Sequence, residues 1–177
     1  PCSDDDSVDE DNFIPMGKPV PIPSSGSIAR ISLSVWLRPK IKSLLSKESF
    51  DIVHVHNPFS GLLPIYIIEF SKSINIATFH NYGTRLYRLG GKQLAMPSFR
   101  KLDGLIAVSE PARDYVSQHF PGKYEIIPNG IAVEEFSQGV EPIKTLKDGM
   151  INLLFLGRLE KRKGLKYLLT AYAKLKW

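Results

Sequence analysis

The chain has 177 residues, 43% of them hydrophobic and 23% charged, which is enough apolar material for a folded domain with its own core. No apolar run approaches the roughly 18–20 residues of a membrane-spanning helix, and the acidic opening stretch is not the pattern of a secretory signal peptide. A single cysteine, Cys2, excludes an intrachain disulfide framework and suits a reducing cytoplasm.

Charge is divided unevenly along the chain. Six of the 18 acidic residues lie within residues 1–11, so that 12 acidic residues face 23 basic ones over the remainder. Such a surplus favours phosphate-rich partners, namely nucleotides, nucleic acid or anionic lipid. The sequence has no RNA-binding aromatic motif, zinc finger or helix-turn-helix pattern, so nucleic acid is not the expected partner.

The amino-terminal part begins as a loop and continues into a basic amphipathic segment. Residues 1–17 show no periodicity. Residues 18–22 are predicted to form a short strand, which must lie at the edge of a sheet because its prolines would break a central ladder. Ser27 is predicted to cap a helix over residues 28–46, which Pro39 kinks or splits. Such a helix either lies on an anionic membrane or packs on the core, and composition favours the core. Five basic residues lie on or beside this segment: Arg30, Arg38, Lys40, Lys42 and Lys47. Of these, Arg38, Lys40 and Lys42 are expected to face solvent.

Strand and helix patterns then alternate regularly. The predicted strands are residues 51–57, 74–80, 104–109 and 124–128, and the predicted helices are residues 60–72, 91–101 and 110–120, the last capped by Ser109. Helices of this length between strands imply right-handed crossovers, and hence an α/β fold with a Rossmann-like parallel sheet and helices on both faces. Asn129–Gly130 is interpreted as a tight turn, the alternative being a cleft-lining loop.

Residues 137–150 have no strong pattern and are interpreted as an interdomain linker. The segment that follows has an apolar run at residues 151–156, typical of a buried parallel strand, and a helical pattern from about Gly164. Between them lie four basic residues at the start of the helix, where unpaired N–H groups and the helix dipole favour an anion. Either this is a solvated basic turn or it is a phosphate site.

The sequence GRLEKRKG in this turn resembles the donor-phosphate motif of retaining glycosyltransferases with the GT-B architecture. The resemblance implies that Arg158 and Lys163 bind the diphosphate of a nucleotide-sugar, with Gly157 and Gly164 completing the donor-binding motif. Further segments occur in the order found in the acceptor domain of that family, so the resemblance covers nearly the whole chain. These segments are GKPVPIPSSGSIARI, DIVHVHNPFSGLLP, ATFHNYG, AVSEPARDYV and IIPNGI.

Residues 26–30 resemble the phosphatidylinositol mannosyltransferase branch of the family, in which this loop faces the acceptor and the next helix is basic and membrane-associated. The resemblance implies acceptor-binding roles for Ser27 and Arg30. The family pattern also includes an earlier strand with a Gly-rich turn and a downstream pair of glutamates that holds the donor sugar and ribose. Neither is in this chain, which indicates an internal fragment whose activity belongs to a longer protein.

Three histidines fall at or near the carboxyl ends of predicted strands, where parallel α/β sheets bind ligands. His54 and His56 share one strand face, and we expect His54 to be a hydrogen-bonded core histidine. The resemblance implies that His80 is catalytic, beside the transferring sugar, and His56 is assigned to the acceptor. Zinc is chemically possible here, but no Asp, Glu or Cys completes the set at a compelling spacing.

The resemblance implies a hexosyltransferase that moves a hexose, namely mannose from GDP-mannose, to a lipid or glycan acceptor with retention. Side chains alone are expected to stabilise the leaving diphosphate, so no metal or other cofactor is expected. The expected location is the cytoplasm, with peripheral attachment to the inner face of the plasma membrane. The predicted domains are residues 1–136, lacking the first strands, and residues 151–177, which begin the donor domain.

Two other functions stay open on the sequence. One is a metal-dependent hydrolase built on the three histidines His54, His56 and His80, and the other is a non-catalytic module that binds nucleotide phosphate. The sugar, the base, the acceptor and the oligomeric state do not follow from the sequence.

Overall fold

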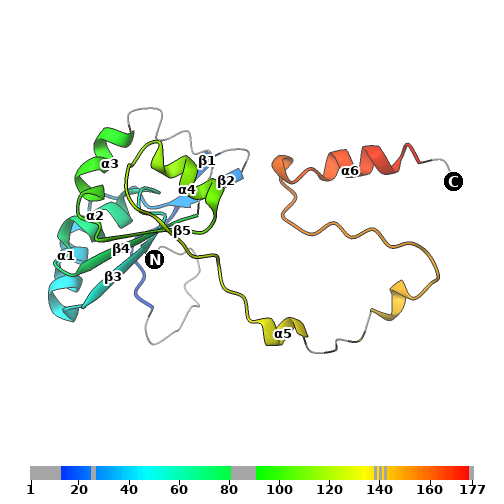
Figure 1. Ribbon diagram of the computed structural model, residues 1–177, viewed down its shortest axis with the longest axis horizontal. Helices are drawn as coiled ribbons and strands as arrows, with labels where there is room; N and C mark the ends of the chain where they lie inside the picture. Colours follow the sequence, from blue (N-terminus) through cyan, green and yellow to red (C-terminus); the bar gives the residue numbers. More distant parts are fainter. Residues whose placement is uncertain are drawn as a thin grey trace. The chain divides into compact units, whose positions relative to one another are not determined.

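A computed structural model describes residues 13–24, 27–80, 91–137, 139, 141 and 143–175. The chain forms two compact units, Pro1–Pro128 and Asn129–Trp177, and each is described by itself (Figure 1). The predicted acidic loop falls largely outside the described residues, as does Gly26 of the acceptor segment. The predicted domain boundaries at residues 136 and 150 stay predictions.

The first unit begins with an antiparallel hairpin of β1 (Val20–Ser24) and β2 (Ser27–Ile31), in which Val20 lies opposite Ile31. The predicted helix over residues 28–46 is therefore wrong in its first part, and Ser27 begins a strand instead of capping a helix. Two isoleucines three residues apart share one face of a helix, but a single such pair is too short a pattern to establish helical periodicity. Residues 27–31 form a strand because they pair with the proline-rich β1, whereas a short helix is only marginally stable by itself.

The second part of that segment is helical, as predicted. Helix α1 (Leu37–Glu48) places Pro39 in its first turn, where proline is tolerated, so Pro39 neither kinks nor splits the helix. Leu37 and Ile41 are buried against Leu63 and Tyr66 of α2 (Leu62–Phe70). The apolar face of α1 is thus part of the core, as composition favoured.

Arg38 is exposed, as predicted, and it is also paired within the protein. Its Nη2 donates to Oε1 of Glu69 at 2.7 Å, and its guanidinium lies 5.0 Å from the ring centre of Tyr66 and 5.2 Å from that of Phe70. The side chain is still half exposed. Arg38 joins α1 to α2 through an ion pair and two aromatic faces, so its charge is engaged within the protein.

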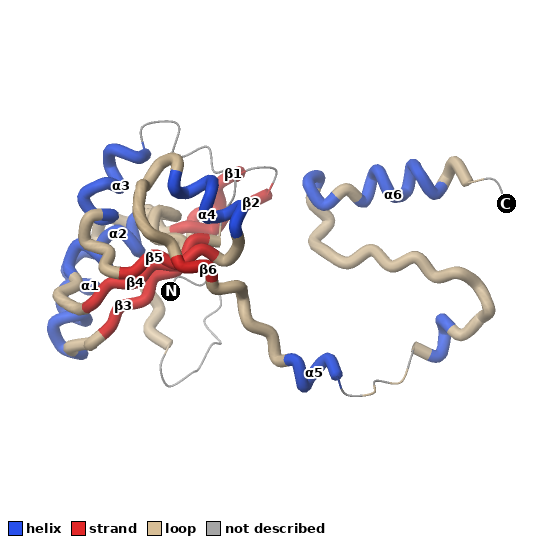
Figure 2. Tube along the Cα trace, in the orientation of Figure 1, coloured by secondary structure: helices blue, strands red, loops and turns tan. Residues whose placement is uncertain are grey.

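The main sheet is parallel, with four strands in the order β3-β4-β5-β6 (Figure 2). Its strands are β3 (Ile52–His56), β4 (Ile74–Phe79), β5 (Gly104–Ala107) and β6 (Glu125–Ile126), joined by α2, α3 (Gly91–Phe99) and α4 (Glu110–Ser117). Ser109 caps α4 as predicted, since its Oγ accepts from the Ala112 N–H at 3.3 Å. The α/β class and the parallel, helix-flanked sheet are confirmed.

The helices lie against one face of this sheet. Right-handed crossovers that advance in one direction place their helices on the same side, and the burial of β3 alternates accordingly. Val53 and Val55 are buried, whereas Ile52, His54 and His56 are exposed. Helices on the second face stay a prediction.

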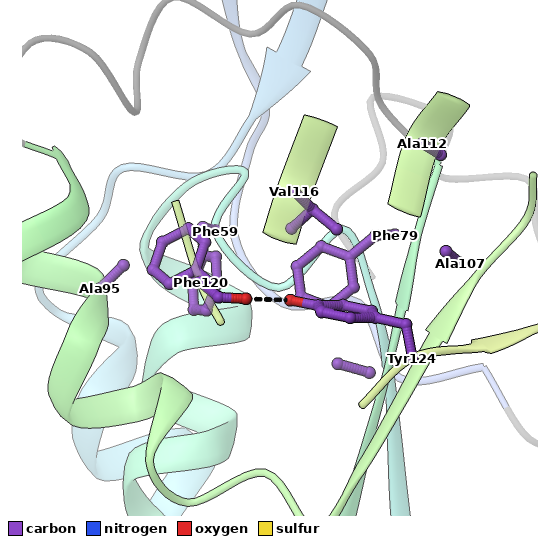
Figure 3. Packing of buried hydrophobic residues seen from close by; sticks show 9 residues of the cluster. Phe59, Phe79, Ala95, Ala107, Ala112, Val116, Phe120 and Tyr124 are labelled. Atoms are coloured by element: carbon purple, nitrogen blue, oxygen red, sulfur yellow. Dashed lines mark hydrogen bonds between the residues drawn. The ribbon is translucent and has the colours of Figure 1, made fainter. Parts of the chain in front are cut away.

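An aromatic cluster fills the space between the sheet and its helices (Figure 3). The rings of Phe59 and Phe120 have centres 4.6 Å apart, and Phe79 meets Tyr124 edge-on at 5.6 Å. The Tyr124 hydroxyl donates to the Phe120 carbonyl at 2.7 Å, which satisfies the one polar group that Tyr124 buries. This cluster holds β4, β5 and α4 together and so fixes the ends of the central strands.

Gly61 brings the hairpin onto the start of α2. Its φ is +105°, and a Cβ at this position would lie 2.8 Å from the Ser32 carbonyl oxygen. That same oxygen accepts from the Leu62 N–H at 2.8 Å. Only glycine permits this close backbone approach.

The second unit contains α5 (Val133–Ser137), the 3₁₀ helices η2 (Lys144–Leu146) and η3 (Lys161–Lys163), and α6 (Leu165–Tyr172). Helix α6 begins where the sequence predicts it. The predicted strand at residues 151–156 is wrong, because a strand requires a hydrogen-bonded neighbour and no described segment pairs with these residues. None of the residues of these four helices is buried.

Candidate functional site

Two of the three predicted histidines are joined by a hydrogen bond at the carboxyl ends of β3 and β4. Nδ1 of His56 lies 2.8 Å from Nε2 of His80, and the ring centres are 5.1 Å apart. His54 lies beside His56 with ring centres 4.6 Å apart, and its Nε2 is 2.7 Å from the Thr78 hydroxyl. The parallel register, which sets His56 opposite Thr78, places all three rings on one face of the sheet.

His54 is only partly what the sequence predicts. It is hydrogen-bonded as expected, but it lies on the exposed side of β3, so its placement in the core is wrong. The alternation of β3 puts the valines inward and the histidines outward.

The environment favours the neutral form of His54 and His80. Partial burial, and to a smaller extent neighbouring His56, lower the pKa of His54. Burial first, then His56 and His54, lower the pKa of His80 below its ordinary value near 6.5. A neutral imidazole has one donor and one acceptor nitrogen, which suits hydroxyl-bearing ligands better than anions.

Two residues that the sequence analysis did not single out support this pair. The Asn57 side-chain oxygen accepts from the His80 backbone N–H at 3.1 Å, and the Asn57 backbone N–H donates to the Thr78 carbonyl at 2.8 Å. Asn57 has φ of +50°, a left-handed conformation that asparagine tolerates. The signal for Asn57 was its position as the last residue of a predicted strand, and that for Thr78 was its place two residues before His80.

The predicted donor-phosphate residues lie on a tight basic loop in the second unit. Gly157 has φ of +147°, and a Cβ there would lie 3.7 Å from Cδ of Lys163, so the Lys163 stem runs alongside Gly157. Gly164, with φ of +82°, ends η3 and begins α6. The loop therefore places the Lys163 stem beside Gly157, just before α6 begins, and the donor-phosphate role of Arg158 and Lys163 stays a prediction.

Glu160 organises this loop and was not predicted. Its Oε1 lies 2.9 Å from Nη1 of Arg158 and its Oε2 lies 3.0 Å from Nε of Arg162. The Glu160 side chain is 17% exposed, far less than either arginine. One carboxylate thus pairs with two guanidinium groups of the same loop. The sequence signal was an acidic residue flanked on both sides by arginines two positions away.

The predicted acceptor residues lie on the hairpin. Ser27 is the first residue of β2, and Arg30, further along the same strand, is exposed. They belong to the small antiparallel sheet, apart from the four-stranded sheet that carries His56 and His80. The described residues contain no group of three or more His, Cys, Asp and Glu side chains suited to hold a metal ion.

The sequence model of glycosyltransferase family 4 matches residues 2–135. The chain belongs to glycosyltransferase family 4. Over 167 residues this family 4 chain is 34% identical to the phosphatidyl-myo-inositol mannosyltransferase of Mycobacterium tuberculosis H37Rv, an alignment that covers 93% of this chain and 44% of the relative. The protein of the same name from Propionibacterium freudenreichii is 32% identical over 163 residues, covering 90% of this chain and 42% of the relative.

The motifs indicated a resemblance to GT-B glycosyltransferases, and the family match and the identity to these relatives confirm it. The family 4 chain spans under half the length of these relatives. In the portion of the chain that the structure describes, no helix is both long and apolar enough to cross a bilayer.

Proposed function

We propose that the protein carrying this chain transfers a mannosyl group from a nucleotide-diphosphate sugar to a phosphatidylinositol-type lipid. The observation that carries the proposal is the 34% identity over 93% of the chain to relatives named phosphatidyl-myo-inositol mannosyltransferases. The hydrogen-bonded imidazoles at the carboxyl ends of β3 and β4 support it, because parallel α/β sheets bind their ligands at these ends.

The donor in this proposal is GDP-mannose, and Arg158 and Lys163 hold its diphosphate. Between Arg158 and Lys163 the loop carries four basic side chains against the one carboxylate of Glu160. As the glycosidic bond to phosphate breaks, negative charge grows on the diphosphate, and fixed cations beside it lower the barrier. A guanidinium can fork across two phosphate oxygens, which suits Arg158 to this role.

The reaction in this proposal retains the anomeric configuration and needs no bound metal. The cationic loop supplies the charge that a divalent ion supplies in other transferases. His80, as a neutral imidazole near the acceptor side, orients a sugar hydroxyl. Treatment with EDTA should leave turnover nearly intact, and a loss of turnover that Mn²⁺ restores would contradict this part of the proposal.

A transfer assay tests the reaction itself. The protein carrying this chain, incubated with GDP-mannose and vesicles that contain phosphatidylinositol, should form a mannosylated lipid whose anomeric proton signal shows the α configuration of the donor. UDP-glucose serves as the control donor, and His80→Ala should lower the rate by about a hundredfold or more. Binding of GDP without transfer would favour the non-catalytic module, and a β-linked product would contradict retention.

A peripheral membrane location follows in this proposal from the surface of the hairpin and α1. Val35 and Trp36 are exposed at the start of α1, with Trp36 86% exposed, and Lys42 and Lys47 are exposed on the helix. Aromatic and basic side chains together favour an anionic bilayer surface, each basic residue contributing about 1 kcal/mol.

Sedimentation with vesicles tests this location. Lys42→Glu with Lys47→Glu should reduce binding to acidic vesicles, and rising salt should release the unaltered protein. Lys144→Glu with Lys147→Glu, exposed in the second unit, is the matched control. Arg38 is left unchanged, because its pairing with Glu69 would confound the result with stability. Equal binding to neutral and acidic vesicles would contradict the membrane location.

A further inference from the structure

The contact between the His56 and His80 rings constrains the proton on each of them. At 2.8 Å between Nδ1 of His56 and Nε2 of His80, one nitrogen donates and the other accepts. Two hydrogens in this gap would repel, and two lone pairs would form no bond. The position of one proton therefore decides which tautomer both rings adopt.

The main chain of His80 is held from the same short segment that holds its ring. The His80 N–H donates to the Asn57 side chain at 3.1 Å, and Asn57 is tied to the Thr78 carbonyl. Consecutive residues of one strand end thus fix both the backbone and the imidazole of His80. Its orientation is set before any ligand arrives.

The neutral form of His80 is the relevant one. The titratable groups that the described residues place against His80 are His56 and His54, and together with burial they disfavour an imidazolium. A neutral histidine more commonly carries its proton on Nε2. If both rings take this form, His80 Nε2–H donates to the bare Nδ1 of His56, and the hydrogen bond needs no rarer tautomer.

We propose that His56 is a positioning residue whose Nδ1 accepts the Nε2–H of His80, so that His80 presents its Nδ1 lone pair as the acceptor for a hydroxyl group. Hydroxyl groups are what a sugar substrate offers, so the role in turnover rests on the proposed function, whereas the tautomer does not. This assignment replaces direct binding of the acceptor by His56 with an action through His80.

Nitrogen-15 NMR of the histidine side chains tests the tautomer without any activity. In the 177-residue chain, His80 should show a protonated Nε2 and an unprotonated Nδ1. His56→Phe removes the acceptor and should shift the His80 signals toward a mixture of tautomers. His56→Asn keeps an oxygen acceptor where Nδ1 stood and should preserve the pattern. His54→Gln, which alters the neighbouring ring without touching the shared hydrogen bond, is the control.

Turnover tests the positioning. In the protein carrying this chain, His56→Phe should lower kcat for mannosyl transfer by about tenfold to a hundredfold, the usual effect of removing a group that orients a functional side chain. The KM for the nucleotide-sugar should change little, and His56→Asn should recover most of the loss. A lower kcat with a nearly unchanged KM, together with recovery in His56→Asn, is not expected of a residue that only stabilises the fold.

The two tests separate the inference from the proposed function. A His80 ring protonated on Nδ1 overturns the inference whatever the activity. The predicted tautomer with unchanged kcat in His56→Phe also overturns the positioning role, while the transfer proposal stands. The predicted tautomer in a protein that transfers no sugar supports the pairing and removes the proposed function.

Discussion

The two units of the chain differ in how many side chains their helices bury. In the first unit Phe120 is fully buried among Phe59, Phe99 and Tyr124, and helices α1 to α4 each bury at least two residues. In the second unit the described helices bury none, although α6 has a clear apolar face. Local pattern is enough to start and end a helix, whereas a core requires a second surface to pack against.

The functional features of the two units differ in the same way. The histidine pair depends on the register of two strands that the aromatic core holds in place. The basic loop depends on two glycines, one carboxylate and the start of one helix, all within eight residues. The first site should therefore be sensitive to core substitutions, and the second should not.

A matched pair of phenylalanines gives the largest expected contrast. Phe120→Ala, at a side chain with no exposure, should lower the free energy of unfolding by about 3–5 kcal/mol. Phe136→Ala, at a side chain that is 76% exposed in the second unit, should change it by about 0.5 kcal/mol or less. Urea unfolding followed by circular dichroism measures both, and similar losses would mean that α5 is packed as firmly as α4.

Two glycines give the next contrast. Gly61→Ala places a Cβ against the Ser32 carbonyl at a positive φ and should cost about 2–3 kcal/mol of unfolding free energy. Gly130→Ala meets nothing within 4 Å and should change the stability by about 0.5 kcal/mol or less. Thermal and urea unfolding of both variants provide the check. A stable Gly61→Ala variant would show that the hairpin can move away from α2.

Removing one arginine should separate binding from stability. Arg158→Ala in the protein carrying this chain should weaken binding of GDP by about 1.5–3 kcal/mol, the range for a charged hydrogen bond, and leave the first unit unaffected. Arg113→Ala, which removes an arginine paired with Asp114 in the first unit, is the control and should not change GDP affinity. Titration calorimetry with GDP and UDP measures the effect, and unchanged affinity for both nucleotides would rule out the donor assignment.

Acid should lower the unfolding free energy of the first unit selectively, and this is the smallest of the four effects predicted here. The folded state lowers the pKa of His54 and His80 relative to the unfolded chain, so it binds fewer protons below the ordinary value near 6.5. The stability from the neutral rings is present above that pH and is lost as pH falls toward the lowered values. All four histidines precede Asn129, so this term has no counterpart in the second unit.

Unfolding measured between pH 8 and pH 5 tests this sign. The double variant His54→Gln with His80→Asn should flatten the fall in stability on the acid side. An unchanged slope in the double variant would place the acid sensitivity in carboxylates instead.

The sequence by itself determined the features that depend on neighbouring residues. Alternating strand and helix patterns predicted the parallel α/β unit, Ser109 predicted the start of α4, and the basic turn with its glycines predicted the loop before α6. The motifs around His80 and Arg158 also led to the family. These signals are local, because backbone capping, glycine conformation and amphipathic periodicity act within a few residues.

The tertiary structure alone decided the features that depend on residues far apart in the chain. Pairing with β1 turned residues 27–31 into a strand, Glu69 and two aromatic rings engaged Arg38, and the direction of the crossovers left His54 exposed. The predicted strand at residues 151–156 has no partner among the described residues. An apolar run indicates that its side chains gain free energy when they are buried. The surface that buries them belongs to other segments of the chain, which the run itself does not specify.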